Sequence, residues 1–162
     1  MAGLDVPAPE YVGRFRGEPG VEIPVFIAEA QGVHHTEVEP ALEEFERRLR
    51  PIVAVLDARY SADAELDEDG VAAITDLAGW AHAEWVRIHP FANGDGRTAR
   101  MWANYLLVRY GLPPVVRLRP RPDLGYGAAG ARAMTGDWEP TARFIRAMLR
   151  ELPPAASRTR RR

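Results

Sequence analysis

The sequence predicts a mainly helical protein with a short extended region ahead of the helices. Apolar residues repeat every three to four positions in several long segments, which are bounded by proline, glycine or capping residues. A stretch rich in glycine and proline precedes them and favours strands and turns over a helix. The chain has 162 residues, 46% of them apolar, which is enough for one domain with a buried core.

Residues 11–33 form the region predicted to be extended. Two segments that favour strands, 11–16 and 21–27, flank a turn-like Gly-Glu-Pro-Gly cluster at 17–20. Pro24 lacks the amide hydrogen that a central strand needs, so we expect this segment at the edge of any sheet.

The first helix is predicted to begin at a capping box. Thr36 and Glu39 stand three residues apart ahead of an apolar-periodic stretch, and a proline is tolerated in the first turn that follows. The apolar residues at helical spacing are Leu42, Phe45 and Leu49. Pro51 should kink or end this helix before residues 52–60 continue it.

The next two helices are predicted on either side of His89. An acidic connector at 61–70 leads to the first of them, which we expect from Val71 onward. Its apolar residues keep a helical period: Ile74, Leu77, Ala81, Trp85 and Ile88. Because a residue before proline disfavours helical geometry, His89 should end this helix. The following helix is expected at about 96–110 and stops at Gly111.

Two short helices, 126–134 and 141–152, should follow a proline-rich loop at 113–122 that carries several arginines. His82 lies on the helix before the motif described below, and we expect a buried, hydrogen-bonded histidine there. Residues 153–162 form a basic tail that we expect to be disordered.

Composition excludes several classes of function. The net charge of -2 gives no global attraction to nucleic acid or to anionic lipid, so nucleic-acid binding is not expected. Without cysteine there are neither disulfides nor thiolate metal sites, and without lysine there is no lysine nucleophile or phosphate clamp. No window approaches the ~18 apolar residues that a membrane span requires, and we expect a cytoplasmic protein.

The segment at 89–100, His-Pro-Phe-Ala-Asn-Gly-Asp-Gly-Arg-Thr-Ala-Arg, carries most of the functional information. His89 is the residue type best suited to accept a proton near neutral pH. Gly94 and Gly96 allow backbone amides to turn toward an anion, at the positive end of the helix that follows. Arg97 and Arg100 lie on one side of its first turn and can bind phosphate oxygens.

A structural interpretation competes with each of these assignments. A histidine at the end of a helix can simply cap it, and arginines three residues apart can be surface charges on an amphipathic helix. Phe91 is expected to anchor the loop in the core and so to fix the position of His89.

The segment resembles the signature of the Fic family, H-P-F-x-[D/E]-G-N-G-R-x-x-R, in all but two positions. Asn93 stands where that family has an acidic residue, and Asp95 stands where it has asparagine. The resemblance extends over about 13–150: residues 13–16 and 21–23 resemble the family's G-x-[YF]-R…V-x-I entry, and Tyr126 falls where relatives often place a tyrosine near the nucleotide base.

The resemblance implies a Fic-like helical bundle at 1–152 with a β-hairpin flap at about 21–35, over a catalytic loop at 89–100. It implies a transferase that moves AMP from ATP to a hydroxyl of a target protein gripped by the flap, with His89 as the base and Mg²⁺ bound with the nucleotide. The residues implied to contact the nucleotide or its phosphates are Asn93, Gly94, Asp95, Gly96, Arg97, Arg100 and Tyr126.

The exchanged pair leaves two interpretations open. Relatives hold Mg²⁺ with the acidic residue at the position of Asn93, so Asp95 could take over metal binding while Asn93 donates to phosphate. Alternatively, Asp95 repels the phosphates, by about 4 kcal/mol for two charges ~4 Å apart at a dielectric of 20, and the site is weakened. Other hypotheses are therefore a different phosphorylated donor, a small-molecule acceptor, or a degenerate nucleotide-binding regulatory module.

Many Fic proteins are silenced by a helix bearing [S/T]-x-x-x-E-[G/N]. Two segments begin this pattern, Ser61 to Glu65 and Thr135 to Glu139, but leucine and proline follow the glutamates. Restraint would then come from a separate inhibitory partner or from the weakened site itself.

Overall fold

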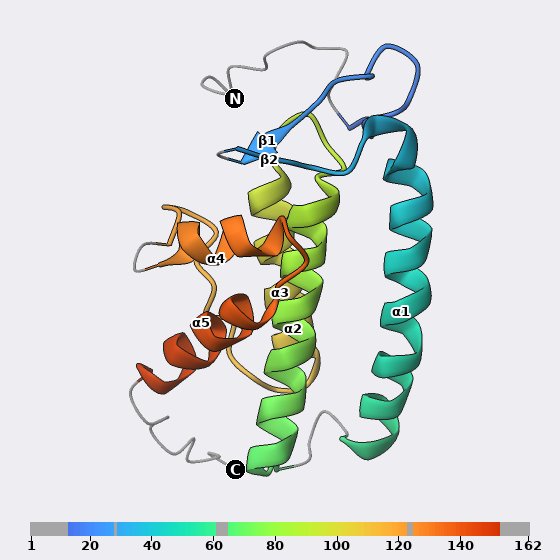
Figure 1. The fold of residues 1–162 in the computed structure, drawn as a ribbon. Coiled ribbons are helices and arrows are strands. Elements are labelled where there is room, and N and C mark those ends of the chain that lie inside the picture. Colours follow the sequence, from blue (N-terminus) through green and yellow to red (C-terminus); the bar gives the residue numbers. More distant parts are fainter. Residues whose placement is uncertain (1–12, 28, 61–64, 123–124, 153–162) are drawn as a thin grey trace.

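The structure, a computed structural model, describes residues 13–27, 29–60, 65–122 and 125–152 and is mainly helical, as predicted (Figure 1). The elements in chain order are β1 (Phe26–Ile27), β2 (Ala30–Gln31), the 3₁₀ helix η2 (His35–Glu37), α1 (Val38–Arg59), α2 (Glu68–Ile88), α3 (Asp95–Arg109), α4 (Tyr126–Ala133) and α5 (Glu139–Arg150).

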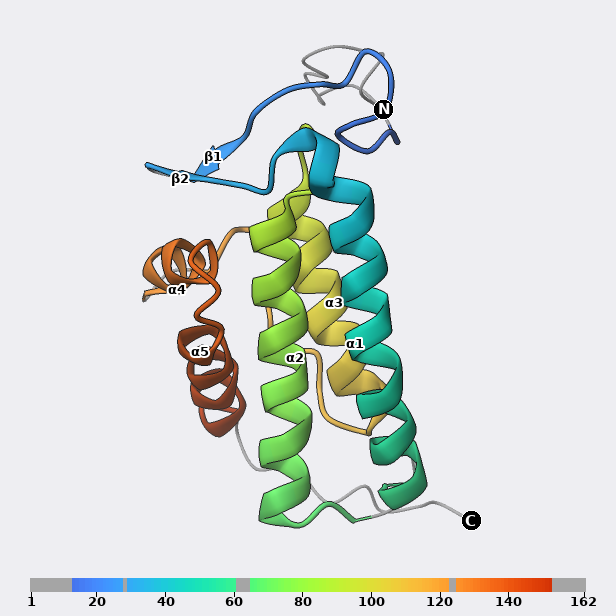
Figure 2. The ribbon, with the colours of Figure 1, turned by 45° about the vertical axis from the view of Figure 1, so that its right-hand side comes forward.

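Helix α2 forms the centre of the bundle. Figure 2 shows α1 and α3 on one side of it and α4 and α5 on the other. Every residue from Leu77 to Val86 is buried, which is the pattern of a helix surrounded by protein. The small residues of α2 allow close packing: a Cβ added to Gly79 would lie 2.5 Å from the Cα of Ala142 on α5.

The aromatic part of the core joins three helices. Phe45 of α1 stacks on Trp80 of α2 with 5.3 Å between ring centroids, and its edge meets Trp85 and Trp102. These large side chains fix the distance of α1 from α2 and α3, because the ring of Phe45 packs against rings from both of the other helices.

The extended region is smaller than predicted. It contains an antiparallel hairpin in which Phe26 pairs with Gln31 and Ile27 with Ala30. Pro24 precedes this hairpin. The hairpin lies above the end of α2 that leads into the 89–100 segment (Figure 1), so the small β element near the N-terminus is confirmed.

The predicted start of the first helix is wrong. Helix α1 begins at Val38 after Glu37, which makes no side-chain capping bond. Thr36 lies instead in η2, where its amide donates to the ring of His34. The hydrogen bond from the Thr36 amide to the His34 ring therefore forms in place of the predicted capping box.

Pro51 does not end the helix, because α1 runs through it to Arg59. The proline is exposed, so the carbonyl that loses its helical partner can be satisfied by water. The other helix ends agree with the predictions more closely. Helix α2 is capped by Asp67 and begins three residues before the predicted Val71, and it ends at His89 as predicted. Gly111, at φ +79°, follows the end of α3. The predicted tail at 153–162 lies outside the described residues, as do 61–64 of the acidic connector.

Candidate active site

His89 lies at the C-terminal end of α2 in a left-handed backbone conformation, with φ +52°. A residue with a Cβ rarely adopts this conformation, which costs about 1–2 kcal/mol. The ring is oriented by a 2.6 Å hydrogen bond between Nδ1 and the carbonyl oxygen of Val86. Because a carbonyl only accepts, Nδ1 donates in this contact, and Nε2 keeps the lone pair that can take up a proton.

Asp95 faces that nitrogen. Its Oδ2 lies 3.7 Å from Nε2 of His89, while Oδ1 accepts a 2.9 Å hydrogen bond from the amide of Phe91. Only 3% of the residue is exposed, and burial raises the pKa of the Asp95 carboxyl, although His89, the Phe91 amide and Arg16 act in the opposite direction. The carboxylate is thus placed to stabilise a protonated imidazole, at some cost to its own ionisation.

Arg16 ties the segment around the hairpin to the loop that follows α2. Its guanidinium donates to four backbone carbonyl oxygens, those of His89 at 2.6 Å, Val33 at 2.7 Å, Ile88 at 2.9 Å and Ile23 at 3.1 Å. The residue is 2% exposed, and burial lowers its pKa, which the charge of Asp95 partly offsets. From the sequence, Arg16 entered only in the resemblance at 13–16 and was assigned no role, because its four partners lie 7 to 73 residues away along the chain and leave no local signal.

Phe91 packs against a residue of the N-terminal loop. Its ring stacks on Phe15 with 5.0 Å between centroids, and the two residues form an isolated antiparallel bridge. Trp85 lies on its other side at 6.3 Å. The loop between α2 and α3 is therefore held both by this aromatic contact and by the amide of Arg16, which donates to the Pro90 carbonyl at 2.7 Å.

The start of α3 offers unpaired amides to an anion. Gly94 caps the helix at φ +105°, a conformation that favours glycine, and its carbonyl accepts from the amides of Arg97 and Thr98. In the described part of the chain, nothing accepts a hydrogen bond from the amides of Gly94 and Gly96. Arg97 is partly exposed beside Gly94 and has no ion-pair partner in the described ranges. The Asn93 residue is exposed on the loop before α3.

Arg100 and Tyr126 contact each other in the interior of the protein. Arg100 is 6% exposed and donates to the hydroxyl of Tyr126 at 3.2 Å and to the carbonyl of Leu118 at 3.0 Å. The Tyr126 hydroxyl also lies 2.8 Å from Nε2 of His82, which is buried as predicted. Burial, reinforced by the charge of Arg100, lowers the pKa of His82 to about 3, so this histidine is neutral.

The protein atoms available to a cation are few. Over the described ranges, no group of three or more histidine and acidic side chains could hold a metal ion. Oδ2 of Asp95 is the carboxylate oxygen that makes no hydrogen bond in this loop, and the Asn93 amide lies two residues away. This donor set fits a cation that arrives with phosphate oxygens, which is how Mg²⁺ is commonly held, and does not fit a resident all-protein site.

A sequence model of the Fic/DOC family matches residues 13–107, which is more than half of the chain. This chain therefore belongs to the Fic/DOC family. Among its relatives, the protein adenylyltransferase Fic of Nematostella vectensis is 37% identical over 109 residues, covering 67% of this chain and 23% of the relative.

Other proteins of the same name are similar over shorter segments. The Culex quinquefasciatus relative is 33% identical over 93 residues, covering 57% of this chain and 18% of its own. The Aedes aegypti relative is 43% identical over 68 residues, covering 42% of this chain and 13% of its own. The chain thus spans less than a quarter of the length of these relatives. Among the described residues, no helix is long and apolar enough to cross a membrane.

Proposed function

We propose that this chain transfers AMP from ATP to a hydroxyl side chain of a target protein. Membership of the Fic/DOC family and the similarity to proteins named protein adenylyltransferase support this reaction. The observation that carries it is the tautomer of His89: Nδ1 donates to Val86, so Nε2 is free to act as a base beside the amides of α3.

In the proposed reaction, Nε2 of His89 removes the proton of the target hydroxyl as its oxygen attacks the α-phosphorus of ATP. The new oxygen–phosphorus bond replaces the bond to the β-phosphate, and pyrophosphate leaves. The amides of Gly94 and Gly96, with the positive end of α3 and Arg97, would stabilise the charge that develops on the phosphates. Asp95 would stabilise the imidazolium once it has formed.

Mg²⁺ bound with ATP would neutralise phosphate charge, with Asp95 as its carboxylate ligand and Asn93 as a neutral one. A cation at Asp95 would also offset the cost of keeping that buried carboxylate ionised. In this proposal the flap at about 21–35 grips the target by strand addition, because among the described residues each strand of the two-stranded hairpin has one edge that pairs with no other strand.

Arg100 and Tyr126 are proposed to reach the nucleotide only after a rearrangement. Both are engaged with each other, and Arg100 also holds the Leu118 carbonyl. ATP would have to replace these contacts, which would make the nucleotide-free site self-restrained. A separate inhibitory partner and a cytoplasmic location also remain parts of the proposal.

The internal contacts of Arg100 favour a second candidate, a site that has lost its nucleotide chemistry or uses a smaller phosphorylated donor. Incubation of the chain and candidate target proteins with α-labelled and with γ-labelled ATP separates these functions. AMP transfer predicts label from the α-labelled donor only. Label from the γ-labelled donor alone indicates phosphoryl transfer, and no label with no calorimetric ATP binding indicates a regulatory module.

A further inference from the structure

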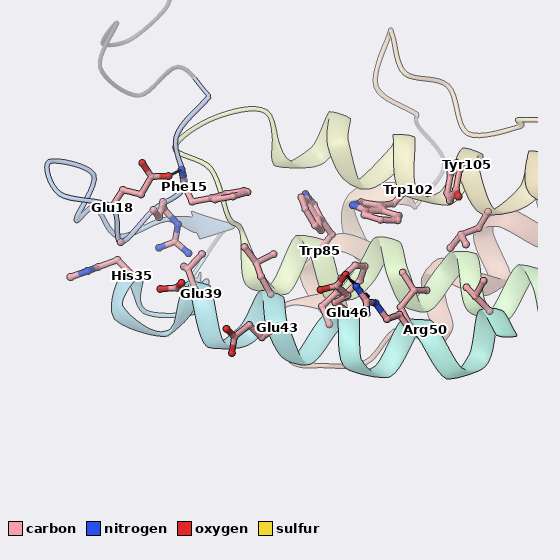
Figure 3. A pocket seen from close by; sticks show the side chains of 18 of the residues that line it. Phe15, Glu18, His35, Glu39, Glu43, Glu46, Arg50, Trp85, Trp102 and Tyr105 are labelled. Atoms are coloured by element: carbon pink, nitrogen blue, oxygen red, sulfur yellow. Dashed lines mark hydrogen bonds and ion pairs between the residues drawn. The ribbon is translucent and has the colours of Figure 1, made fainter.

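A groove of about 1100 Å³ runs between α1 and α3, on the face of the bundle away from Arg100 and Tyr126. Figure 3 shows it from close by, with the rings of Phe15, Trp85, Trp102 and Tyr105 following one another along its length. On α3 the groove is lined by Trp102, Tyr105, Leu106 and Arg109. These side chains point about 120–180° away from Arg100, since each helical residue turns by about 100°.

The floor of the groove is aromatic and partly open to solvent. Trp102 lies 5.7 Å from Trp85 and 6.0 Å from Tyr105 between ring centroids. Tyr105 is 54% exposed although it lies next to this cluster. A groove lined by aromatic side chains, one of them half exposed, is typical of a surface that binds another molecule.

The wall formed by α1 is acidic. Glu39 and Glu43 both line the groove, four residues apart on one helical face, and neither forms an ion pair with any described residue. Like charges at this spacing destabilise a helix by a few tenths of a kcal/mol. Three further acidic residues of the lining are already paired, Glu18 with Arg14, Glu46 with Arg50 and Asp57 with Arg109. The unpaired charge is therefore concentrated at the end of the groove nearer Phe15.

We propose that the groove binds an amphipathic helix of a partner protein, with apolar residues on one face and arginine or lysine beside it. The apolar face would cover Trp85, Trp102 and Tyr105, and the basic residues would face Glu39 and Glu43. A straight slot between two helices suits a third helix, which docks by apolar residues spaced three and four apart. The basic tail of this chain, 153–162, contains no large apolar residue to cover the aromatic floor, so a partner helix fits the groove better.

The groove is connected to the catalytic loop. Phe15 lines its end and stacks on Phe91, and Trp85 of the floor lies against the same ring. Arg16, which holds the carbonyl of His89, also lines this end. A helix in the groove would therefore touch residues that position His89. Binding itself does not depend on the proposed transfer of AMP, so the test below stands even if that reaction is not found.

The test uses a synthetic fluorescent helix of about 18 residues, long enough to span about 27 Å. It carries leucine at positions spaced three and four apart and arginine on either side of them. A second peptide has glutamate in place of each arginine. The basic peptide should bind the full chain about tenfold more tightly than the acidic one at low salt, because two or three exposed charge pairs differ between them.

Variants and spectra locate the binding. Reversing Glu39 and Glu43 to arginine should invert the preference, whereas reversing Glu44 and Glu151, which lie outside the lining, should not. Tyr105→Ser should weaken both peptides about threefold or more, and the equally exposed Val108→Ser should not. In the wild type, the indole signals of Trp85 and Trp102 should shift on binding, while those of Trp80 and Trp138 should not.

Equal affinity for the two peptides, no binding of either, or indole shifts outside the groove would overturn the proposal. Tighter binding to a chain that ends at Leu152 would assign the groove to the basic tail instead. Concentration-dependent dimers with the same indole shifts and no peptide would assign it to a second copy of the chain.

Discussion

The guanidinium of Arg16 and the carbonyl oxygen of His89, 73 residues apart in sequence, are joined by a 2.6 Å hydrogen bond. The same side chain donates to Ile88 at the end of α2 and to Val33 beyond the hairpin. The left-handed conformation of His89 turns its carbonyl toward Arg16 and its ring toward Asp95. One buried cation therefore holds the flap, the end of α2 and the proposed base in a single arrangement.

Replacing Arg16 with lysine should lower AMP transfer by about 10- to 100-fold, because a displacement of about 1 Å at the base costs that much. An ammonium cannot reach the four carbonyls that the guanidinium binds. The ring ¹⁵N shifts of His89 should show a mixed tautomer in this variant and the Nδ1–H form in the wild type.

Arg47→Lys on the exposed face of α1 is the matched control for this change, and it should leave both readouts unaltered. If Arg16→Lys lowered only the melting temperature and preserved the tautomer and the rate per folded molecule, the role of Arg16 would be structural.

Asp95→Asn should stabilise the folded chain at neutral pH. Burial raises the pKa of Asp95, so the folded state prefers the protonated carboxyl, and stability is lost as pH rises through that raised pKa. Asparagine keeps an oxygen for the Phe91 amide without the charge. The free energy of unfolding of the variant relative to wild type should grow above pH 4 by about 1.4 kcal/mol for each unit by which the pKa is raised. Urea titrations at several pH values measure it; a constant difference would contradict the assignment.

Exchanging the pair, Asn93→Glu with Asp95→Asn, should lower transfer of AMP by about tenfold or more. The exchange restores the family signature but removes the carboxylate that faces Nε2 of His89 at 3.7 Å, where it can stabilise the protonated ring. The exposed position of residue 93 places the new charge on the loop surface. Initial rates at saturating ATP and Mg²⁺ compare the two proteins, and a rate increase would mean that the native pair is a weakened version of the signature.

His82 should make the protein acid-sensitive. Its pKa is lowered to about 3 by burial and by Arg100, below the usual 6.5 that the unfolded chain retains. Protons therefore bind the unfolded state preferentially between these values, and stability falls as pH decreases from 6.5 toward 3, by about 1.4 kcal/mol for each unit at most. His82→Gln should show a shallower decline over this range in the same urea titrations. Parallel curves for the two proteins would show that His82 is not the source.

Gly79→Ala should destabilise the fold by about 1–3 kcal/mol, because the added Cβ would lie 2.5 Å from the Cα of Ala142 and force α5 away from α2. Gly130 on α4 provides the opposite case, since a Cβ there would meet nothing within 4 Å. Gly130→Ala should therefore stabilise the protein by roughly 0.5–1 kcal/mol through helix propensity. Thermal unfolding of both variants is the check, and two changes of the same sign would contradict this packing.

Helical periodicity was sufficient to predict the helices, because α2 and α3 bury strong apolar patterns and end at His89 and before Gly111. It was insufficient at the start of α1, where a local bond between Thr36 and His34 outweighs the capping box. Strand lengths were overestimated because the residues around Arg16 form turns, and the carbonyls of Ile23 and Val33 accept from its guanidinium and not from a neighbouring strand.

The 89–100 segment was enough to predict the proposed base and the amides near it, since both depend on local sequence. The contacts of Arg100 and Tyr126 could not be predicted in this way, because they join residues 26 positions apart through the packing of α4 against α2. The same holds for the aromatic contact between Phe15 and Phe91, which depends on how the N-terminal loop crosses the end of α2.

The most direct test of the account is a crystal structure of the chain with Mg²⁺ and a non-hydrolysable ATP analogue. We expect the phosphates against the amides of Gly94 and Gly96, the cation on Asp95, and Nε2 of His89 facing the α-phosphate with Nδ1 still bonded to Val86. A nucleotide bound away from α3, or an imidazole turned from the phosphates into the core, would contradict the proposed chemistry.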